Sequence, residues 1–273
     1  MNSRPVPKSM TMPTLFPANP LWGDQKTIHY QEIKTFTVNY LTEKAALAPY
    51  LPEGIIVPEN PLMMVTYSMC RGIREMGGTG YNMVSVTVGA RFEGKQDKYD
   101  GNLCLVIWEN KFPPVLQGRE HLGFPKLVAE IGDAWMGEDR WGWRVSENGT
   151  CFLEGELYDL VKLSEEECRA VNAASVSDFS SGDLNMTYKV IPGANYDEEP
   201  ITAHMVGVVE RSNVKEAWSC KGSLQWCPVT PQSCYLCYGI IESLSRLPVV
   251  KYEPCMITRR SHVIEMGNSR RLI

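Results

Sequence analysis

Alternation of hydrophobic and polar residues runs through much of this chain and predicts β-strands. Over residues 33–40, Phe36 and Val38 fall on one face, which is the pattern of a half-buried strand. Residues 83–92 alternate most clearly, with the valines of the segment on a single face. Residues 104–108 are apolar on both faces, which indicates a strand covered on two sides. These segments together predict layered or closed sheets.

The remaining elements fit the same class. Further strands are predicted over residues 63–69, 152–161, 184–191, 203–214, 223–227 and 257–265. Helices are few: Thr42 can cap a short one that Pro49 stops, and Ser164 with Glu167 forms a capping box that starts another. Many strands with few helices predict a mainly β fold of barrel or sandwich type.

The chain is expected to form one domain preceded by an arm. Residues 1–29 contain five prolines and no periodicity, which predicts an extended N-terminal arm. The hydrophobic fraction of 44% is enough for residues 30–273 to build a single core. The run Gly77-Gly-Thr-Gly80 lacks the lysine and Ser/Thr of a phosphate-binding loop, so a flexible hairpin is predicted there.

Composition narrows the possible partners. The net charge of −5 arises from mixed-sign positions without a basic block, which argues against nucleic acid. No apolar segment approaches the roughly 18 residues of a membrane span, and no signal peptide is evident, so a soluble cytoplasmic protein is expected.

The nine cysteines are then expected to be reduced. Cys234 and Cys237 form a C-x-x-C pair, but Cys220 and Cys227 are too widely spaced for a second pair, so buried thiols are favoured over zinc.

The most informative segment is Gly118-Arg-Glu-His-Leu-Gly-Phe-Pro-Lys126, which follows the buried strand. It resembles the G-R-E-x-x-[GA]-[FY]-P-K run of acetoacetate decarboxylases. Shorter segments resemble the same family in matching order: Tyr50-Leu-Pro-Glu-Gly-Ile, Gly80-Tyr81, Lys189-Val-Ile-Pro, Glu216-Ala-Trp218, Leu247-Pro-Val and Ser261-His262. The resemblance implies a closed antiparallel β cone around a cavity, association into homo-oligomers, no organic cofactor or metal, and a Schiff base between Lys126 and a ketone.

The chemistry implied for Lys126 has a physical requirement. A free lysine amine ordinarily titrates near pKa 10.4, so at neutral pH it is protonated and cannot attack a carbonyl. Burial penalises the ammonium form, and activation by desolvation or by a neighbouring cation is established for acetoacetate decarboxylases themselves. The imine that forms is an electron sink. Decarboxylation, aldol and dehydration chemistry can all proceed from it.

Several positions depart from the family pattern. Leu127 stands where the best-known decarboxylases have a second lysine, Met83 and Ser68 occupy the positions of two glutamates, and Ile33 takes the place of an arginine. These changes predict a roomier and less polar pocket, and hence a substrate larger and more apolar than acetoacetate.

Neighbouring polar residues are candidates for the pocket, each with a structural alternative. Arg119 and Glu120 either orient the substrate or fix the loop that carries Lys126. His121 either shuttles protons or is simply solvated. Tyr67 and Tyr81 either donate hydrogen bonds from their phenols or pack in the core.

The leading hypothesis is a lyase that uses a Schiff base at Lys126 on an apolar keto substrate, such as a β-keto acid or a polyketide-like intermediate of specialised metabolism. The reaction expected first is decarboxylation. An aldolase-dehydratase or a cyclase could use the same pocket, and a non-catalytic protein that binds small molecules is the other alternative.

Overall fold

The computed structural model describes residues 26–273. The predicted arm over residues 1–29 lies outside this range apart from its last residues, and the first strand begins at Ile28. The strands are β1 (Ile28–Leu41), β2 (Ile55–Ile56), β3 (Leu62–Ile73), β4 (Tyr81–Glu93), β5 (Lys98–Glu109), β6 (Lys126–Val128), β7 (Trp135–Met136), β8 (Arg140–Glu147), β9 (Thr150–Lys162), β10 (Val176–Ser177), β11 (Asp183–Ile191), β12 (Thr202–Val208), β13 (Glu210–Trp226), β14 (Lys251–Ile264) and β15 (Arg270–Arg271). The α-helices are α1 (Lys44–Leu47), α2 (Phe112–Gln117), α3 (Glu165–Ala173) and α4 (Tyr238–Ser245), and the short turns are η1 (Ala48–Tyr50), η2 (Arg74–Met76) and η3 (Gly118–Leu122).

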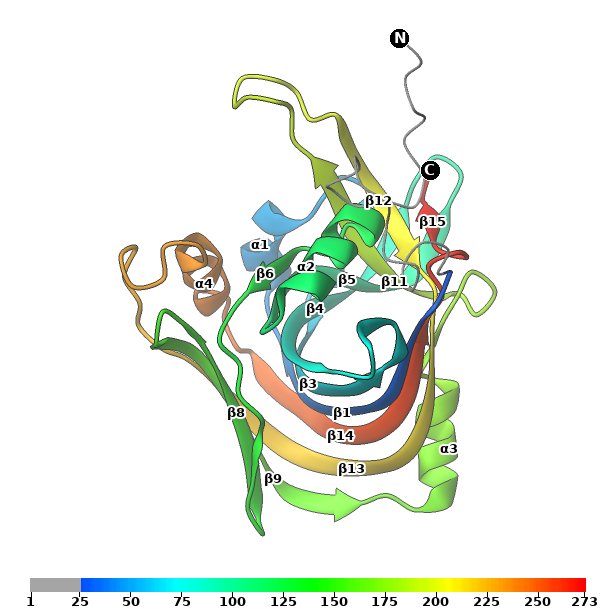
Figure 1. Ribbon diagram of the computed structural model, residues 1–273, viewed down its shortest axis with the longest axis vertical. Coiled ribbons are helices and arrows are strands. Elements are labelled where there is room, and N and C mark those ends of the chain that lie inside the picture. Colours follow the sequence, from blue (N-terminus) through cyan, green and yellow to red (C-terminus); the bar gives the residue numbers. More distant parts are fainter. Residues whose placement is uncertain (1–25) are drawn as a thin grey trace.

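One strongly curved sheet dominates the molecule. Its main path runs β15-β12-β11-β5-β4-β3-β1-β14-β13-β9-β8-β7, and the pairs are antiparallel except where β5 meets β6 and β11. The long strands β3, β1, β14 and β13 curl around a common interior (Figure 1). The mainly β cone expected from the sequence is confirmed. Over the described residues the sheet is curved and is not closed as expected, with β15 and β7 at the two ends of its path.

Most predicted elements are confirmed, with differences at their ends. The segment predicted as one strand over residues 203–214 is divided at Val209 between β12 and β13, and residues 223–227 belong largely to the end of β13. Ser164 and Glu167 form the predicted capping box of α3. Thr42 is not the cap of α1, since Glu43 occupies that position.

The turn between β3 and β4 matches the predicted hairpin. Gly77 and Gly78 both have positive φ, of 65° and 80°, which glycine adopts without a steric penalty.

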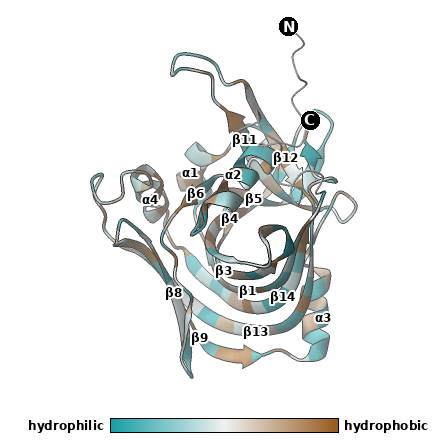
Figure 2. Cartoon of the chain, in the orientation of Figure 1, coloured by the Kyte–Doolittle hydropathy of each residue, from teal (hydrophilic) through white to brown (hydrophobic). Residues whose placement is uncertain are grey.

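The hydrophobic core lies outside the cone. Phe36, Val38 and Tyr67 point away from the interior and are fully buried under the layer formed by β8 and β9. Tyr67 stacks on Trp143 of β8 with ring centroids 5.7 Å apart. The opposite faces of β1 and β3 carry mainly hydroxyl and amide side chains, and bands of alternating hydropathy follow the curved strands in Figure 2. The cone therefore has an apolar outer face and a polar lining.

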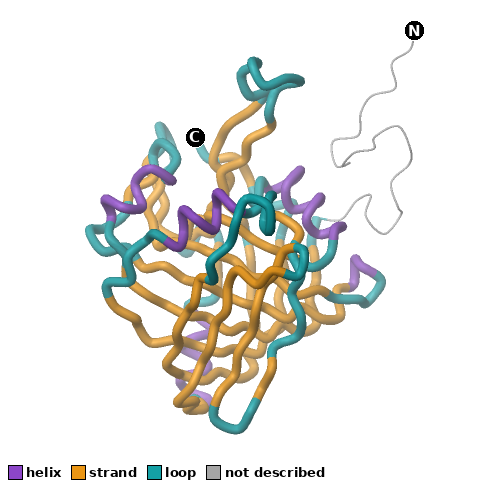
Figure 3. Tube along the Cα trace, turned by 90° about the vertical axis from the view of Figure 1, so that its left-hand side faces the viewer, coloured by secondary structure: helices purple, strands orange, loops and turns teal. Residues whose placement is uncertain are grey.

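The helices lie around the outside of the strands (Figure 3). In the described part of the chain, none is both long and apolar enough to cross a membrane. Near α4, Cys234 and Cys237 are buried, and Trp108 donates its indole N–H to Cys237 Sγ at 3.2 Å. Cys220 of β13 lies across from Cys255 of β14, and both thiols are buried.

Candidate active site

Neighbouring strands line the interior of the cone in cross-strand rows. The arginine row contains Arg260, Ile33, Cys70 and Tyr81. The middle row contains Thr258, Thr35, Ser68, Met83 and Glu109. The lysine row contains Met256, Thr37, Thr66, Ser85, Ile107 and Lys126. Apart from Glu109, these residues border one cavity of about 400 Å³.

Lys126 lies at the rim of this cavity beside a buried carboxylate. Its side chain is 9% exposed and that of Glu109 is 0% exposed, and Lys126 Nζ lies 2.8 Å from Glu109 Oε1. The angles do not give a well-directed hydrogen bond to either Glu109 oxygen, so attraction between the charges dominates this contact. Nζ also donates to the carbonyl of Pro114 at 3.2 Å. Burial raises the pKa of Glu109, and the Lys126 ammonium partly offsets this rise.

The segment before Lys126 explains how the amine is held. Helix α2 begins with prolines in its first turn and leads into η3, a π-helical turn. Gly118 joins them and packs on the Lys126 side chain: a Cβ there would meet Lys126 Cε, Cδ and Nζ at 2.6, 2.7 and 2.8 Å. The Arg119 guanidinium donates to the Lys126 carbonyl at 2.9 Å. Gly118 and Arg119 therefore hold the side chain and the backbone of Lys126.

Two phenols and an imidazole lie near the arginine row. The hydroxyls of Tyr30 and Tyr81 are 3.0 Å apart, and burial raises the pKa of both phenols well above the ordinary value. His262 Nδ1 lies 2.9 Å from Ser212 Oγ, and its ring is 5.5 Å from that of Tyr30. Both phenols therefore stay protonated at neutral pH and can donate hydrogen bonds inside the cavity.

The predicted pocket residues separate into two groups. Tyr81, Met83 and Ser68 line the cavity, and Met83 and Ser68 are direct cross-strand partners. Tyr67 points to the opposite face, where its hydroxyl donates to the Gly132 carbonyl at 2.8 Å. Leu127 also packs against the core outside the cavity.

The polar residues of η3 lie outside the cavity wall. The backbone carbonyls of Glu120 and His121 accept hydrogen bonds from the Lys189 ammonium, the second at 3.0 Å. Burial, and then the charge of Lys189, lower the pKa of the His121 imidazole. The described residues that line the cavity do not include Arg119, Glu120 or His121. Their positions fit the alternative in which they fix the loop that carries Lys126.

Sequence reasoning missed four residues of the cavity region: Glu109, Tyr30, Glu210 and Arg260. Met83, Ser68 and Ile33 do stand in the cavity wall in place of the family's two glutamates and arginine, but Glu109, Glu210 and Arg260 bring carboxylates and a guanidinium to this region from other positions. The wall is also more polar than Met83 alone predicts, because hydroxyl side chains fill much of the middle and lysine rows. One signal was available: Glu109 is the single charged residue at the end of a strand that is apolar on both faces.

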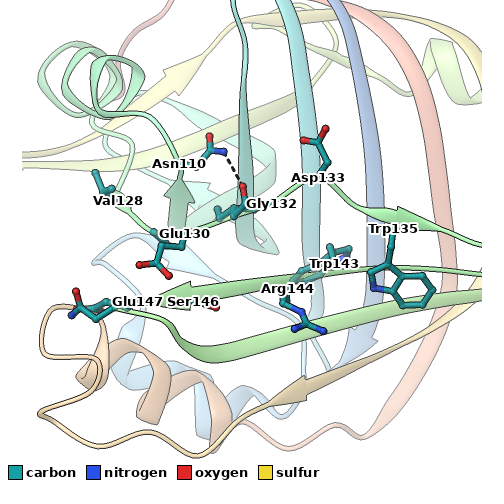
Figure 4. A pocket seen from close by; sticks show the side chains of 13 residues that line it. Asn110, Val128, Glu130, Gly132, Asp133, Trp135, Trp143, Arg144, Ser146 and Glu147 are labelled. Atoms are coloured by element: carbon teal, nitrogen blue, oxygen red, sulfur yellow. Dashed lines mark hydrogen bonds between the residues drawn. The ribbon is translucent and has the colours of Figure 1, made fainter.

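A larger groove, of about 730 Å³, lies outside the cone (Figure 4). Glu130 and Asp133 border it from the segment after β6, and Arg144 borders it from β8. Asn110 donates to the Ile131 carbonyl at 2.8 Å and holds that segment in place. The groove contains no lysine and no cysteine, so the interior cavity is the better candidate for covalent chemistry despite its smaller volume.

His262 should make stability depend on pH. Burial, and secondarily Arg260, lower its pKa to about 3, whereas an unfolded histidine titrates near 6.5. The unfolded chain therefore binds a proton that the folded chain excludes, so stability should be complete above about pH 6.5 and fall as the pH drops toward 3. We expect this to cost about 2 kcal/mol between pH 7 and 4.5.

Urea unfolding across this range should show a flatter pH profile for His262→Gln, which can keep a hydrogen bond to Ser212. His204→Gln provides the comparison, because that imidazole is only partly buried: burial and then the charge of Arg271 lower its pKa in the same direction, so its substitution should flatten the profile less than that of His262. An unchanged slope in His262→Gln would contradict the assignment.

Comparisons with known proteins agree with this fold. The acetoacetate decarboxylase (ADC) family matches residues 11–253. The chain is 26% identical over 228 residues to an acetoacetate decarboxylase of Bordetella avium, with 81% of each chain covered. It is 33% identical over 121 residues to that of Ralstonia nicotianae, which spans 44% of each chain.

Solved structures extend the similarity to the whole chain. The acetoacetate decarboxylase of Legionella pneumophila has a TM-score of 0.72 at 17% identity, and the match covers 100% of this chain and 98% of the other. The enduracididine biosynthesis enzyme MppR, complexed with pyruvate, has a TM-score of 0.67 at 13% identity, with 98% of each chain covered.

The curved sheet is a β cone with a buried lysine at its cavity, and the family match supports a superfamily of decarboxylase-like lyases. The chain belongs to the acetoacetate decarboxylase family.

Proposed function

We propose that this protein is a lyase that forms a Schiff base between Lys126 and the ketone of a small-molecule substrate. The observation that carries the proposal is the buried pair of Lys126 and Glu109, with 2.8 Å between Nζ and Oε1, at the rim of an enclosed cavity. An amine that reacts with a carbonyl must lose a proton first, and Glu109 is placed to accept it. Burial raises the pKa of Glu109, which favours its taking up this proton.

The proposed reaction passes through an imine and an enamine at Lys126. Lys126 gives its proton to Glu109, and the nitrogen lone pair attacks the ketone carbon while the carbonyl oxygen takes up a proton. Loss of water gives the protonated imine. For a β-keto acid, the bond to the carboxylate then breaks, carbon dioxide leaves, and the electron pair passes into the imine to give an enamine. Protonation at carbon and hydrolysis release a ketone and the free amine.

The cavity favours a substrate of moderate size with a partly apolar body. Its volume of about 400 Å³ is at the lower end of small-molecule pockets. Met64, Met83, Met186 and Met256 provide flexible apolar surface in the wall, and threonine hydroxyls provide hydrogen bonds. Such a lining fits a keto compound larger than acetoacetate.

Borohydride trapping tests the proposal. Incubation with 2-hexanone and sodium borohydride should reduce the imine to a stable secondary amine, and peptide mass mapping should locate the added mass on Lys126. Lys189 is an internal control, because its ammonium is held by two backbone carbonyls and should stay unlabelled. Labelling spread evenly over the lysines, or none at Lys126 with any of several ketones, would rule out the proposed chemistry.

An aldol condensation in the same cavity is the second candidate. Tyr30 and Tyr81 are protonated phenols 3.0 Å apart, and such donors can stabilise the alkoxide that an enamine forms with an aldehyde. A related fold is known from MppR complexed with the condensation product of pyruvate and imidazole 4-carboxaldehyde. Product analysis separates the two candidates, since only decarboxylation releases carbon dioxide.

A further inference from the structure

Arg260 is a cation inside the cavity with no fixed partner. Its side chain extends from β14 into the arginine row and borders the cavity. The Nε atom is buried and has no hydrogen-bond partner among residues 26–273. No carboxylate of the described residues lies within ion-pair distance of the guanidinium, although Arg259, its neighbour in sequence, pairs with Glu216 at 2.6 Å. A guanidinium that borders a cavity with a buried, unsatisfied Nε and no ion-paired carboxylate among the described residues is poised to bind an anion.

Glu210 does not neutralise Arg260 directly. In the β13–β14 ladder Glu210 faces Ile264 and Val214 faces Arg260, which separates their backbones by roughly 13 Å along the strand. The Glu210 carboxylate accepts a hydrogen bond from Asn185 at 3.1 Å and lies 3.7 Å from His262 Nε2. Burial raises the pKa of Glu210 and the charge of Arg260 partly offsets this rise, so the two groups attract each other through space without forming an ion pair.

Arg260 and Lys126 border the same cavity from different sides. Along the strands only the middle row separates the arginine row from the lysine row, roughly 13 Å, and across the sheet β1, β3, β4 and β5 curve around the cavity between β14 and β6. Both side chains border the cavity, and the charges of both partly offset the burial that raises the pKa of the Cys70 thiol, so both lie near that residue. A small molecule in the cavity can therefore contact both.

We propose that Arg260 binds the carboxylate of the substrate whose ketone reacts with Lys126, so that the substrate is a keto acid held at both ends. This inference rests on the proposed function, because it places the reacting ketone at Lys126. Guanidinium and carboxylate groups match in shape and form paired, charge-assisted hydrogen bonds, which a lysine cannot reproduce.

The test compares acids with their esters. Trapping at Lys126 is measured with 2-, 4- and 5-oxohexanoate and with the methyl ester of each; 3-oxo acids are omitted because they lose carbon dioxide unaided. For at least one separation between ketone and carboxylate, the wild-type protein should reach half-labelling at a concentration of acid about 10- to 100-fold lower than the concentration of ester. Arg260→Gln should remove this preference, so that acid and ester reach half-labelling at similar concentrations, whereas Arg260→Lys should retain part of it.

A second measurement needs no variant and avoids any folding defect. Hexanoate should slow the labelling of wild-type protein by 2-hexanone, and hexanamide should not. Equal labelling by acids and esters in the wild type, or an acid preference that survives in Arg260→Gln, would overturn the role of Arg260. Labelling by esters and neutral ketones without acid preference would leave the Schiff base intact and reject only this inference. A complete absence of labelling would reject both.

Discussion

Replacing Lys126 with methionine should destabilise the protein by about 3–5 kcal/mol, because it leaves the Glu109 carboxylate buried without its counter-charge. The same substitution should abolish borohydride labelling at this position.

Glu109→Gln keeps the amine but removes the proton acceptor, so the labelling rate should fall by about 100-fold or more. The double variant Lys126→Met, Glu109→Met should recover most of the lost stability, since it removes both charges together.

Urea unfolding of the single and double variants measures these effects. Lys162→Met is the matched control: Lys162 pairs with Glu216 at the same distance of 2.8 Å, but its side chain is 58% exposed. Loss of such an exposed pair should cost at most about 1 kcal/mol. If Lys126→Met proved as stable as Lys162→Met, the buried pair would not have the energetic role assigned to it.

Alanine at Gly118 should nearly eliminate Schiff-base formation without touching the amine itself. Gly118 has φ −64° and ψ −41°, so alanine suits its backbone and would ordinarily favour the helical turn. Its Cβ, however, would lie within 2.8 Å of the Lys126 side chain. The lysine must move, and a displacement of about 1 Å at a reacting atom can cost about 100-fold in rate.

Gly239→Ala provides the comparison for this prediction. Gly239 lies in α4, and a Cβ at that position would meet no heavy atom within 4 Å. This variant should label at the wild-type rate, with stability unchanged or raised by up to about 1 kcal/mol. Wild-type labelling in Gly118→Ala would show that the amine does not depend on the close packing of Gly118.

The sequence was sufficient to predict the strands and part of the cavity wall. Period-two alternation identified the cone strands because one face of each packs in the apolar core, as Phe36 and Val38 do. The resemblance to the decarboxylases placed Met83 and Ser68 at the positions of two glutamates on adjacent strands, and the two residues are cross-strand partners. The strand predictions succeeded because local periodicity determines which face a side chain occupies.

Contacts between distant segments could not be predicted in this way. Arg260 enters the cavity because β14 pairs with β1, which places it beside Ile33 more than two hundred residues earlier in the chain. The sequence shows that Thr258, Arg260 and His262 share a face of one strand, but not that this face is the interior. Glu109 meets Lys126 through the parallel pairing of β5 with β6, which joins segments separated by a helix.

The end strands of the curved sheet determine how easily a strand from another molecule could add to it. A sheet that does not close leaves edge strands, whose free amide and carbonyl groups can recruit strands from other molecules and start aggregation. Here the path ends in β7 and β15, which have 2 residues each. The second of these consists of Arg270 and Arg271, both exposed. Both end strands are short and one is charged, which disfavours strand addition where they lie, although each pairs with its neighbour, β12 or β8, over two residues alone.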